Sequence, residues 1–211
     1  MGLCEHCDRG VIPREHTERG LAHIVNGLIT LCLAAGRVPE FGEEKVLAPI
    51  FRGFGVKHGY YVDIGSSGPY SNTEWLQGLG WHGLALDRAT NPVHHVTAEN
   101  VDTLLEGVPV EFPFLSVDVD GMDYWILKAI LRTRRPLVIC VEFNQNKMAE
   151  DDIQPYDPAY VWLGGGGNGC SWRALNALVE PLTYMLCFKN LVNVIFVRNI
   201  ADTIRAVLPR G

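Results

Sequence analysis

The sequence predicts a single α/β domain built on a mostly parallel β-sheet with an antiparallel hairpin near the C-terminal end. Short apolar runs such as Phe114–Asp118 and Leu137–Phe143 alternate with helical patterns, as parallel strands covered on both faces do. Two later runs, Tyr184–Phe188 and Val192–Val197, are separated by only three residues, too few for a parallel crossover. At 211 residues the chain has the length of one such domain.

Apolar residues recur at three- and four-residue spacing over 17–35, which predicts an amphipathic N-terminal helix that ends at Gly36. Beyond it, strand and helix patterns alternate as far as residue 143. The expected helices cover Glu43–Phe54, Asn72–Leu79, Asn100–Leu105 and Asp123–Arg132, and the expected strands cover Tyr60–Ile64, Gly83–Asp87, Val93–Thr97, Phe114–Asp118 and Leu137–Phe143.

A long polar and glycine-rich connection, about 147–169, precedes a helix expected near Ser171. Connections of this length in a compact domain are usually lids or disordered segments. As a lid, it would cover an acceptor with Tyr156, Tyr160 and Trp162 and exclude water. We find no linker, so we expect one domain, with a tail and helix over 1–40 and a core over 41–211.

The charge balance argues against nucleic acid as a partner, since 18 Lys and Arg residues face 24 Asp and Glu residues and leave a net charge of −6. The longest nearly uncharged stretch, Leu21–Gly36, is shorter than the roughly 20 residues that span a bilayer. The first ten residues lack the apolar core of a secretory signal, and the cysteines in the middle of the sequence, such as Cys32 and Cys140, lie in apolar runs, like reduced thiols. We expect a cytoplasmic protein, in which the helix Leu21–Leu33 closes the core or contacts a second copy.

The first strand ends in a turn that combines an acid with glycines, Asp63-Ile64-Gly65-Ser66-Ser67-Gly68. Glycines at such a turn let the backbone bend sharply and let a ligand approach the main chain. Asp87 ends the next strand, where a carboxylate accepts both hydrogen bonds of a ribose diol. Asp63 would repel a pyrophosphate and attract an ammonium, which favours S-adenosylmethionine over a dinucleotide. Alternatively, Gly65 and Gly68 only form the turn, and Asp87 is only a strand end.

This turn resembles motif I of class I S-adenosylmethionine-dependent methyltransferases, and the chain from about Phe41 to Arg198 resembles their FkbM-like family. The resemblance departs from the family pattern at Glu44, where aspartate is usual, and at Ser66–Tyr70. It rests on the blocks Phe41–Glu44, Gly80–Leu84, Glu99–Val101, Leu115–Trp125, Gly169–Leu175 and Asn193–Arg198, which occur in the family order.

The resemblance implies a Rossmann-like, doubly wound sheet of seven strands, with the donor lying across the carboxyl ends of the first strands. It also implies a methyltransferase that acts on a hydroxyl of a small molecule, such as a sugar or a secondary metabolite. The residues that the motif and the resemblance assign to the donor are Glu43, Asp63, Gly65, Ser66, Ser67, Gly68, Asp87, Arg88, Asn100 and Asp118.

Acidic side chains gather after the next two strands: Asp118, Asp120 and Asp123 follow one, and Glu142 and Asn144 end the other. Since neighbouring strands lie about 4.8 Å apart, we expect Asp118 and Glu142 to face one crevice, where oxygen ligands suit Mg²⁺, Mn²⁺ or Ca²⁺ better than zinc. A bound ion would lower the pKa of a substrate hydroxyl. We expect Asp118, Asp120 and Glu142 to be catalytic, and Asp118, Glu142 and Asn144 to bind the metal. Alternatively, Asp118 binds only the donor, Asp120 caps the next helix, and Asp123 favours its dipole.

Several points stay open at this level. The function is alternatively that of a non-catalytic module that binds S-adenosylmethionine, or of a nicotinamide-dependent oxidoreductase. Cys4 and Cys7 have C-x-x-C spacing without a second such pair, which favours reduced thiols in a tail over a zinc site. Candidates for a general base are His82, His94, His95, Asp152, Asp157 and Tyr156.

Overall fold

The computed structural model describes residues 42–65, 72–87 and 95–199. The strands are β1 (Tyr60–Ile64), β2 (His82–Leu86), β3 (Phe114–Val117), β4 (Val138–Glu142), β5 (Tyr184–Lys189) and β6 (Asn193–Arg198). The α-helices are α2 (Glu44–Gly53), α3 (Glu74–Gln77), α4 (Val101–Leu104), α5 (Asp123–Thr133) and α6 (Trp172–Val179), and the 3-10 helix η4 (Glu180–Leu182) follows α6.

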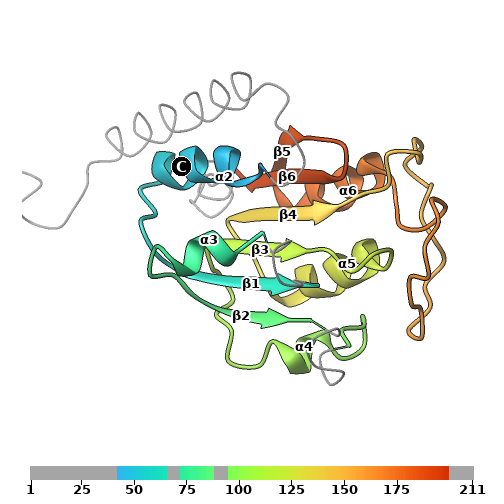
Figure 1. The fold of residues 1–211 in the computed structure, drawn as a ribbon, viewed down its shortest axis with the longest axis horizontal. Coiled ribbons are helices and arrows are strands. Elements are labelled where there is room, and N and C mark those ends of the chain that lie inside the picture. The colour runs from blue at the N-terminus through green and yellow to red at the C-terminus, as the bar shows by residue number, and fades with distance from the viewer. Residues whose placement is uncertain (1–41, 66–71, 88–94, 200–211) are drawn as a thin grey trace, which may run out of the picture.

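The strands form one six-stranded sheet in the order β2-β1-β3-β4-β6-β5 (Figure 1). Strands β1 to β4 run parallel, whereas β6 is antiparallel to both of its neighbours, β4 and β5. The mixed α/β class and the C-terminal antiparallel hairpin are therefore confirmed.

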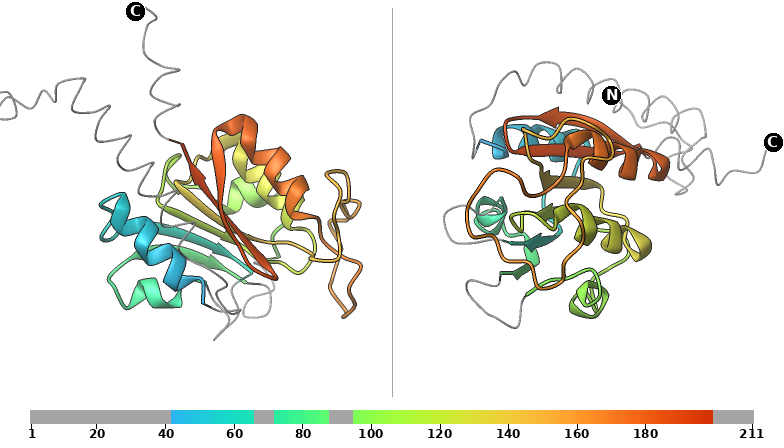
Figure 2. Two further views of the ribbon diagram at one scale, coloured as in Figure 1. Left: turned by 90° about the horizontal axis from the view of Figure 1, so that it is seen from above. Right: turned by 90° about the vertical axis from the view of Figure 1, so that its right-hand side faces the viewer.

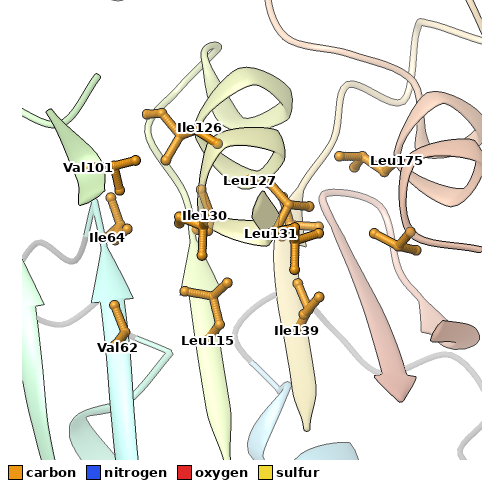
Figure 3. Packing of buried hydrophobic residues seen from close by; sticks show 14 of the residues in the cluster. Val62, Ile64, Val101, Leu115, Ile126, Leu127, Ile130, Leu131, Ile139 and Leu175 are labelled. Atoms are coloured by element: carbon orange, nitrogen blue, oxygen red, sulfur yellow. The ribbon is translucent and has the colours of Figure 1, made fainter. Parts of the chain in front are cut away.

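Helices cover both faces of the sheet (Figure 2). On one face, α5 packs its buried apolar side chains against Leu115 and Ile139 (Figure 3). On the other face, the Phe51 ring of α2 lies 4.8 Å from the Trp81 ring and 5.6 Å from the Phe114 ring, measured between centroids. This two-sided burial explains why β3 and β4 are apolar at nearly every position.

The structure differs from the expected elements around the second strand. The weak strand expected over Val93–Thr97 is not formed over 95–97, and residues 93 and 94 lie outside the described ranges. The Asn100 side chain explains this, because its amide donates to the His95 carbonyl and its oxygen accepts from the Thr97 N–H. Within the described ranges the sheet has six strands rather than the implied seven.

The predicted lid begins beyond the carboxyl end of β4 and passes beside the carboxyl ends of the strands (Figure 1). Its two arms meet at an isolated antiparallel bridge between Ile153 and Cys170. Next to the bridge, the Gln154 N–H donates to the Gly169 carbonyl over 2.9 Å. Residues 154–169 therefore form a loop with a closed base, fixed where it joins the domain.

The cysteine expectation is confirmed for two residues and wrong for one. Cys140 and Cys170 are buried free thiols. Cys187 on β5, by contrast, is disulfide-bonded.

No helix among the described residues has the length and apolar character needed to cross a membrane. The helix expected over 17–35 lies outside the described residues. The same holds for six of the singled-out residues, namely Cys4, Cys7, Ser66, Ser67, Gly68 and Arg88, and for the base candidate His94.

Candidate functional site

The predicted donor residues of three strands lie level with one another at the carboxyl edge of the sheet. Ile64 pairs with Leu86 on one side and with Val117 on the other, so the next residues, Gly65, Asp87 and Asp118, are adjacent. Backbone hydrogen bonds of 2.8 Å, from the Gly65 N–H to Leu86 and from the Asp118 N–H to Ile64, extend the pairing to this edge.

Gly65 is required by the packing of the backbone at this edge. Its φ of +91° lies in the region that favours glycine. A Cβ at this position would lie 1.5 Å from the carbonyl oxygen of Asp118. The group that approaches the glycine is therefore the neighbouring strand end, and the glycine lets β1 and β3 end side by side.

A cavity of about 340 Å³ opens over these strand ends, between Gly65, Asp87 and Asp118 on the sheet side and Tyr156 and Trp162 of the lid. Its described lining contains four aspartates (Asp87, Asp118, Asp120 and Asp157) and no Lys or Arg. Such a lining attracts cationic ligands and repels anionic ones.

The lid is fastened to both sides of this cavity. The Tyr156 hydroxyl donates to Glu99 and accepts from the Ala98 N–H, and a His95 ring nitrogen lies 2.9 Å from the Pro158 carbonyl oxygen. The Trp125 indole N–H donates to the Gln154 carbonyl over 2.8 Å. These contacts place the aromatic part of the lid over the strand ends.

Three carboxylates meet beside the cavity, where Asp118, Asp120 and Glu142 each bring an oxygen within 4.8 Å of the other two. Asp120 has a φ of +58°, a left-handed conformation that aspartate tolerates better than most residues. These three are the residues that the sequence predicts to be catalytic.

The carboxylates suit a divalent cation because they crowd negative charge at a place where two of them, Asp118 and Glu142, are only partly exposed to solvent. Burial and the neighbouring acids raise the pKa of Asp118 to about 8 and that of Glu142 to about 10. Groups that resist ionisation together are neutralised either by protons or by a positive ion, and oxygen-only donors fit Mg²⁺ or Mn²⁺.

We expect the protein in EDTA to lose stability as the pH rises. Asp118 and Glu142 ionise near their usual low pKa when unfolded but only at about 8 and 10 when folded. The folded state therefore binds more protons above about pH 4, so its stabilisation is full below that pH and lost as the pH rises through 8 to 10. The measurement is the melting temperature between pH 5 and 8. A slope no steeper than that of Asp118→Asn would contradict the assignment.

Asp123 shapes the turn between these acids. It is buried, and its two oxygens accept from the Val119 N–H over 2.9 Å and from the Gly121 N–H over 2.8 Å. Asp120 does not cap α5 with its side chain, because the N-cap residue is Met122 and makes no such bond. The alternative role of Asp120 as a helix cap is therefore wrong.

We expect Asp123→Ala to lower the free energy of unfolding by about 3 kcal/mol, because one buried and one partly buried N–H donor lose their acceptor. Chemical denaturation measures the change. The control is Asp102→Ala, which removes an exposed carboxylate bonded to Thr133 and is expected to cost less than about 1 kcal/mol. Equal midpoints for the two variants would contradict the role of Asp123.

Asn144 lies at the rim of this group. Its amide donates to the carbonyls of Gly166 and Asn168, and its oxygen accepts from the Asn146 N–H. Asn168 in turn donates to the Asp120 carbonyl over 3.0 Å. The structure thus uses Asn144 to hold the lid beside the acids, whereas the sequence suggests it as a metal ligand.

The remaining residues that were predicted to bind S-adenosylmethionine form hydrogen bonds with neighbouring segments. The buried Asp63 carboxylate accepts from the Thr73 hydroxyl over 2.5 Å. Glu43 is buried and accepts from the amides of Asn190 and Asn193 on the hairpin. Asn100 shapes the 95–100 loop, as described above. Thr73 was not predicted as a site residue, because no motif in the neighbouring sequence indicates its contact with Asp63.

Only some of the candidates for the general base lie at the strand-end cavity. His82 lies at the start of β2, the end opposite to the carboxyl edge. Asp152 is 2.6 Å from the Lys147 ammonium and lines no described cavity. Burial and the bond to Glu99 raise the pKa of Tyr156. His95 and Asp157 do line the cavity.

Comparison with known proteins gives one partial likeness. The chain is similar to a tRNA N6-adenosine threonylcarbamoyltransferase from Herminiimonas arsenicoxydans, with 30% identity over 134 residues. The match covers 57% of this chain, and the chain spans 39% of the length of that relative. No protein-family model matches the chain, and no solved structure matches it significantly.

Proposed function

We propose that the protein is an S-adenosylmethionine-dependent methyltransferase of the FkbM-like family that methylates a hydroxyl group of a small molecule with the help of a divalent cation. The observation that carries this proposal is the cavity at the strand ends, lined by four aspartates and, among the described residues, by no Lys or Arg. S-adenosylmethionine carries a sulfonium and an ammonium and no phosphate, so its charges suit this lining.

The strand order supports a donor at this edge. The chain passes from β1 to β2 on one side and then returns to β3 on the other side of β1. In doubly wound α/β sheets, ligands bind outside the carboxyl ends of the strands at such a change of direction. We infer on this basis that the sheet is Rossmann-like and that the cavity at its strand ends receives the donor.

In this arrangement, Asp87 accepts the hydrogen bonds of the donor ribose. We expect Asp87→Ala to weaken the binding of S-adenosylhomocysteine about tenfold or more, because both accepting oxygens are lost. Isothermal titration calorimetry measures the dissociation constant. Binding as tight as in the wild type would remove Asp87 from the donor site.

The three carboxylates have different roles in the proposed reaction. S-adenosylmethionine, when bound, would supply an electrophilic methyl group, and Mg²⁺ or Mn²⁺ would supply positive charge that lowers the pKa of the acceptor hydroxyl. Asp118 and Glu142 would hold that cation. Asp120 is the most exposed of the three carboxylates. Partial desolvation raises its pKa, without the added effect of neighbouring acids that acts on Asp118 and Glu142. We therefore assign to Asp120 the role of taking the hydroxyl proton. The lid covers the donor and limits access of water.

Three other functions come into consideration, and the first two are less well supported. The two phosphates of a nicotinamide dinucleotide would face the four aspartates. The threonylcarbamoyltransferase relative acts, by its name, on adenosine in tRNA, but a net charge of −6 and an acidic cavity do not favour RNA as a substrate. A non-catalytic module that binds S-adenosylmethionine differs only in making no product.

A panel of ligands followed by product analysis tests the proposal. S-adenosylhomocysteine should raise the melting temperature and NAD⁺ or NADH should not, because only a ligand of the folded state stabilises it. Mass spectrometry of candidate hydroxyl acceptors, with and without EDTA, should then show methylation that EDTA suppresses. Stabilisation by NAD⁺ alone would contradict the proposal. Donor binding without any methylated product would instead favour the non-catalytic module that binds S-adenosylmethionine.

A further inference from the structure

Cys187 on β5 has a partner outside the described ranges. It is disulfide-bonded, whereas Cys140 and Cys170 are free thiols and so cannot be its partner. The remaining cysteines of the sequence are Cys4, Cys7 and Cys32. The partner of Cys187 is therefore one of these three, all of which precede the first described residue.

The surface around Cys187 belongs to the side of the sheet that α2 covers. Cys187 is half-buried and packs against the apolar cluster of that side. The outer strands β5 and β6 contribute to this cluster Phe188, Ile195 and Val197. On the opposite side of the sheet α6 contacts β5, and no described helix contacts β5 as extensively on the Cys187 side. Within the described part of the chain, the outer strands therefore lack a comparable helical cover on this side.

The described chain begins beside this surface. The Glu43 carboxylate, just before α2, accepts from the Asn190 amide over 2.8 Å and from the Asn193 amide over 2.9 Å, at the turn of the hairpin. Asn190 follows Cys187 by three residues, which is about 10 Å of strand. Cys32 precedes Glu43 by eleven residues, and a chain of that length spans at most about 40 Å. Among the three candidate partners, Cys32 therefore has the shortest connection to Cys187.

Cys32 also lies on the apolar stripe of the helix that the sequence predicts over 17–35. At about 100° per residue, Leu21, Leu28 and Cys32 fall within about 40° of one another, and Thr30 falls on the opposite side. Such a stripe is stable only when it is buried against an apolar surface. Because residues 36–43 are a connection of the length that joins antiparallel neighbouring helices, the expected helix would lie next to α2.

We propose that residues 17–35 dock as an amphipathic helix on the α2 side of β5 and β6, and that a disulfide between Cys32 and Cys187 fixes them there. The occupant of this surface is the N-terminal segment of the same chain rather than a second copy, and the inference does not depend on methyl transfer. The disulfide forms by exchange with a small disulfide such as glutathione disulfide, which takes up two electrons and two protons from the two thiols and leaves as two thiols. A dithiol reductant reverses the exchange.

Peptide mapping of the full chain tests the pairing. The protein is equilibrated with glutathione disulfide, alkylated with N-ethylmaleimide and digested with trypsin without reductant. Cleavage after Lys and Arg separates the cysteines into the peptides 174–189 (Cys187), 20–37 (Cys32) and 1–9 (Cys4 and Cys7). Mass spectrometry should find 174–189 joined to 20–37. Peptide 174–189 joined to 1–9, or alkylated at Cys187, would overturn the pairing. A covalent dimer on a non-reducing gel would show that a second copy occupies the surface and would overturn the proposal.

Thermal stability gives an independent measure of the tether. Dithiothreitol should lower the melting temperature of the wild type by about 5–10 °C, because a disulfide that closes a long loop stabilises the fold. Cys187→Ser should melt at the lower temperature with or without dithiothreitol. The matched control, Cys7→Ser, should keep the response of the wild type. A wild type that does not respond, or a response that is lost in Cys7→Ser, would contradict a tether through Cys32.

Substitutions on the expected helix separate docking from the tether. In the reduced full chain, Leu28→Asp places a charge on the apolar stripe, and the control Thr30→Asp places the same charge on the opposite side. Leu28→Asp should speed the reaction of Cys187 with N-ethylmaleimide about tenfold, because the segment no longer shields the thiol, whereas Thr30→Asp should react like the wild type. Mass spectrometry of peptide 174–189 measures the rate, and circular dichroism shows that each variant is folded. Equal rates for Leu28→Asp and the wild type would overturn the docking.

Discussion

Gly65→Ala is expected to lower the free energy of unfolding by about 3 kcal/mol or more and to abolish donor binding. The added Cβ would overlap the Asp118 carbonyl oxygen at 1.5 Å, and that oxygen belongs to backbone that a side-chain rotation cannot move. To make room, β1 and β3 must separate at the edge where Gly65, Asp87 and Asp118 lie level. We therefore expect the stability of the protein and the proposed donor site to be lost together.

Gly55→Ala is the matched control for this prediction. Gly55 also has a positive φ, +70°, but a Cβ there would meet nothing within 4 Å. It therefore carries the backbone strain without the overlap, which is expected to cost about 1–2 kcal/mol. Urea denaturation of both variants gives the comparison. Equal losses would show that backbone strain alone, rather than the contact with Asp118, explains the effect at Gly65.

Asp118→Asn is expected to reduce turnover about 100-fold or more while changing donor affinity about tenfold at most. In the cation-bound protein, the substitution would remove a negatively charged ligand from the group that Asp118 forms with Asp120 and Glu142. Without a cation, burial and the neighbouring acids raise the pKa of Asp118 to about 8, so the carboxyl group is protonated at neutral pH and asparagine resembles it. The variant should therefore fold.

Steady-state kinetics over a range of Mg²⁺ concentrations, with calorimetry of the donor, measure both effects. Asp151→Asn, an exposed lid residue that lines no described cavity, should behave like the wild type. Equal losses of turnover and donor affinity in Asp118→Asn would move this residue from the cation to the donor site.

The sequence predicted the sheet well because its strands are buried on both faces. Strand β1 forms over the predicted residues Tyr60–Ile64, and β3 and β4 lie within one residue of the predicted ends. Helix α3 is shorter than expected, four residues in place of Asn72–Leu79. Thr73 and Asn72 donate to Asp63 and Ser116, and these contacts with the sheet fix the start of that segment.

The gathering of Gly65, Asp87, Asp118 and Glu142 was also predictable, since parallel strands place their carboxyl ends at one edge. The contacts between distant segments that complete the site were not predictable from the sequence. Glu43 meets Asn190 and Asn193 across about 150 positions of sequence, and Tyr156 meets Glu99 across 57. Such pairs depend on the path of loops, which no local pattern of residues encodes.

The central claim is that the strand-end cavity holds S-adenosylmethionine, and direct titration of the purified chain with S-adenosylhomocysteine tests it. Calorimetry should show saturable binding to one site, weakened in Asp87→Ala. No heat of binding up to millimolar S-adenosylhomocysteine, from protein shown by circular dichroism to be folded, would contradict the claim.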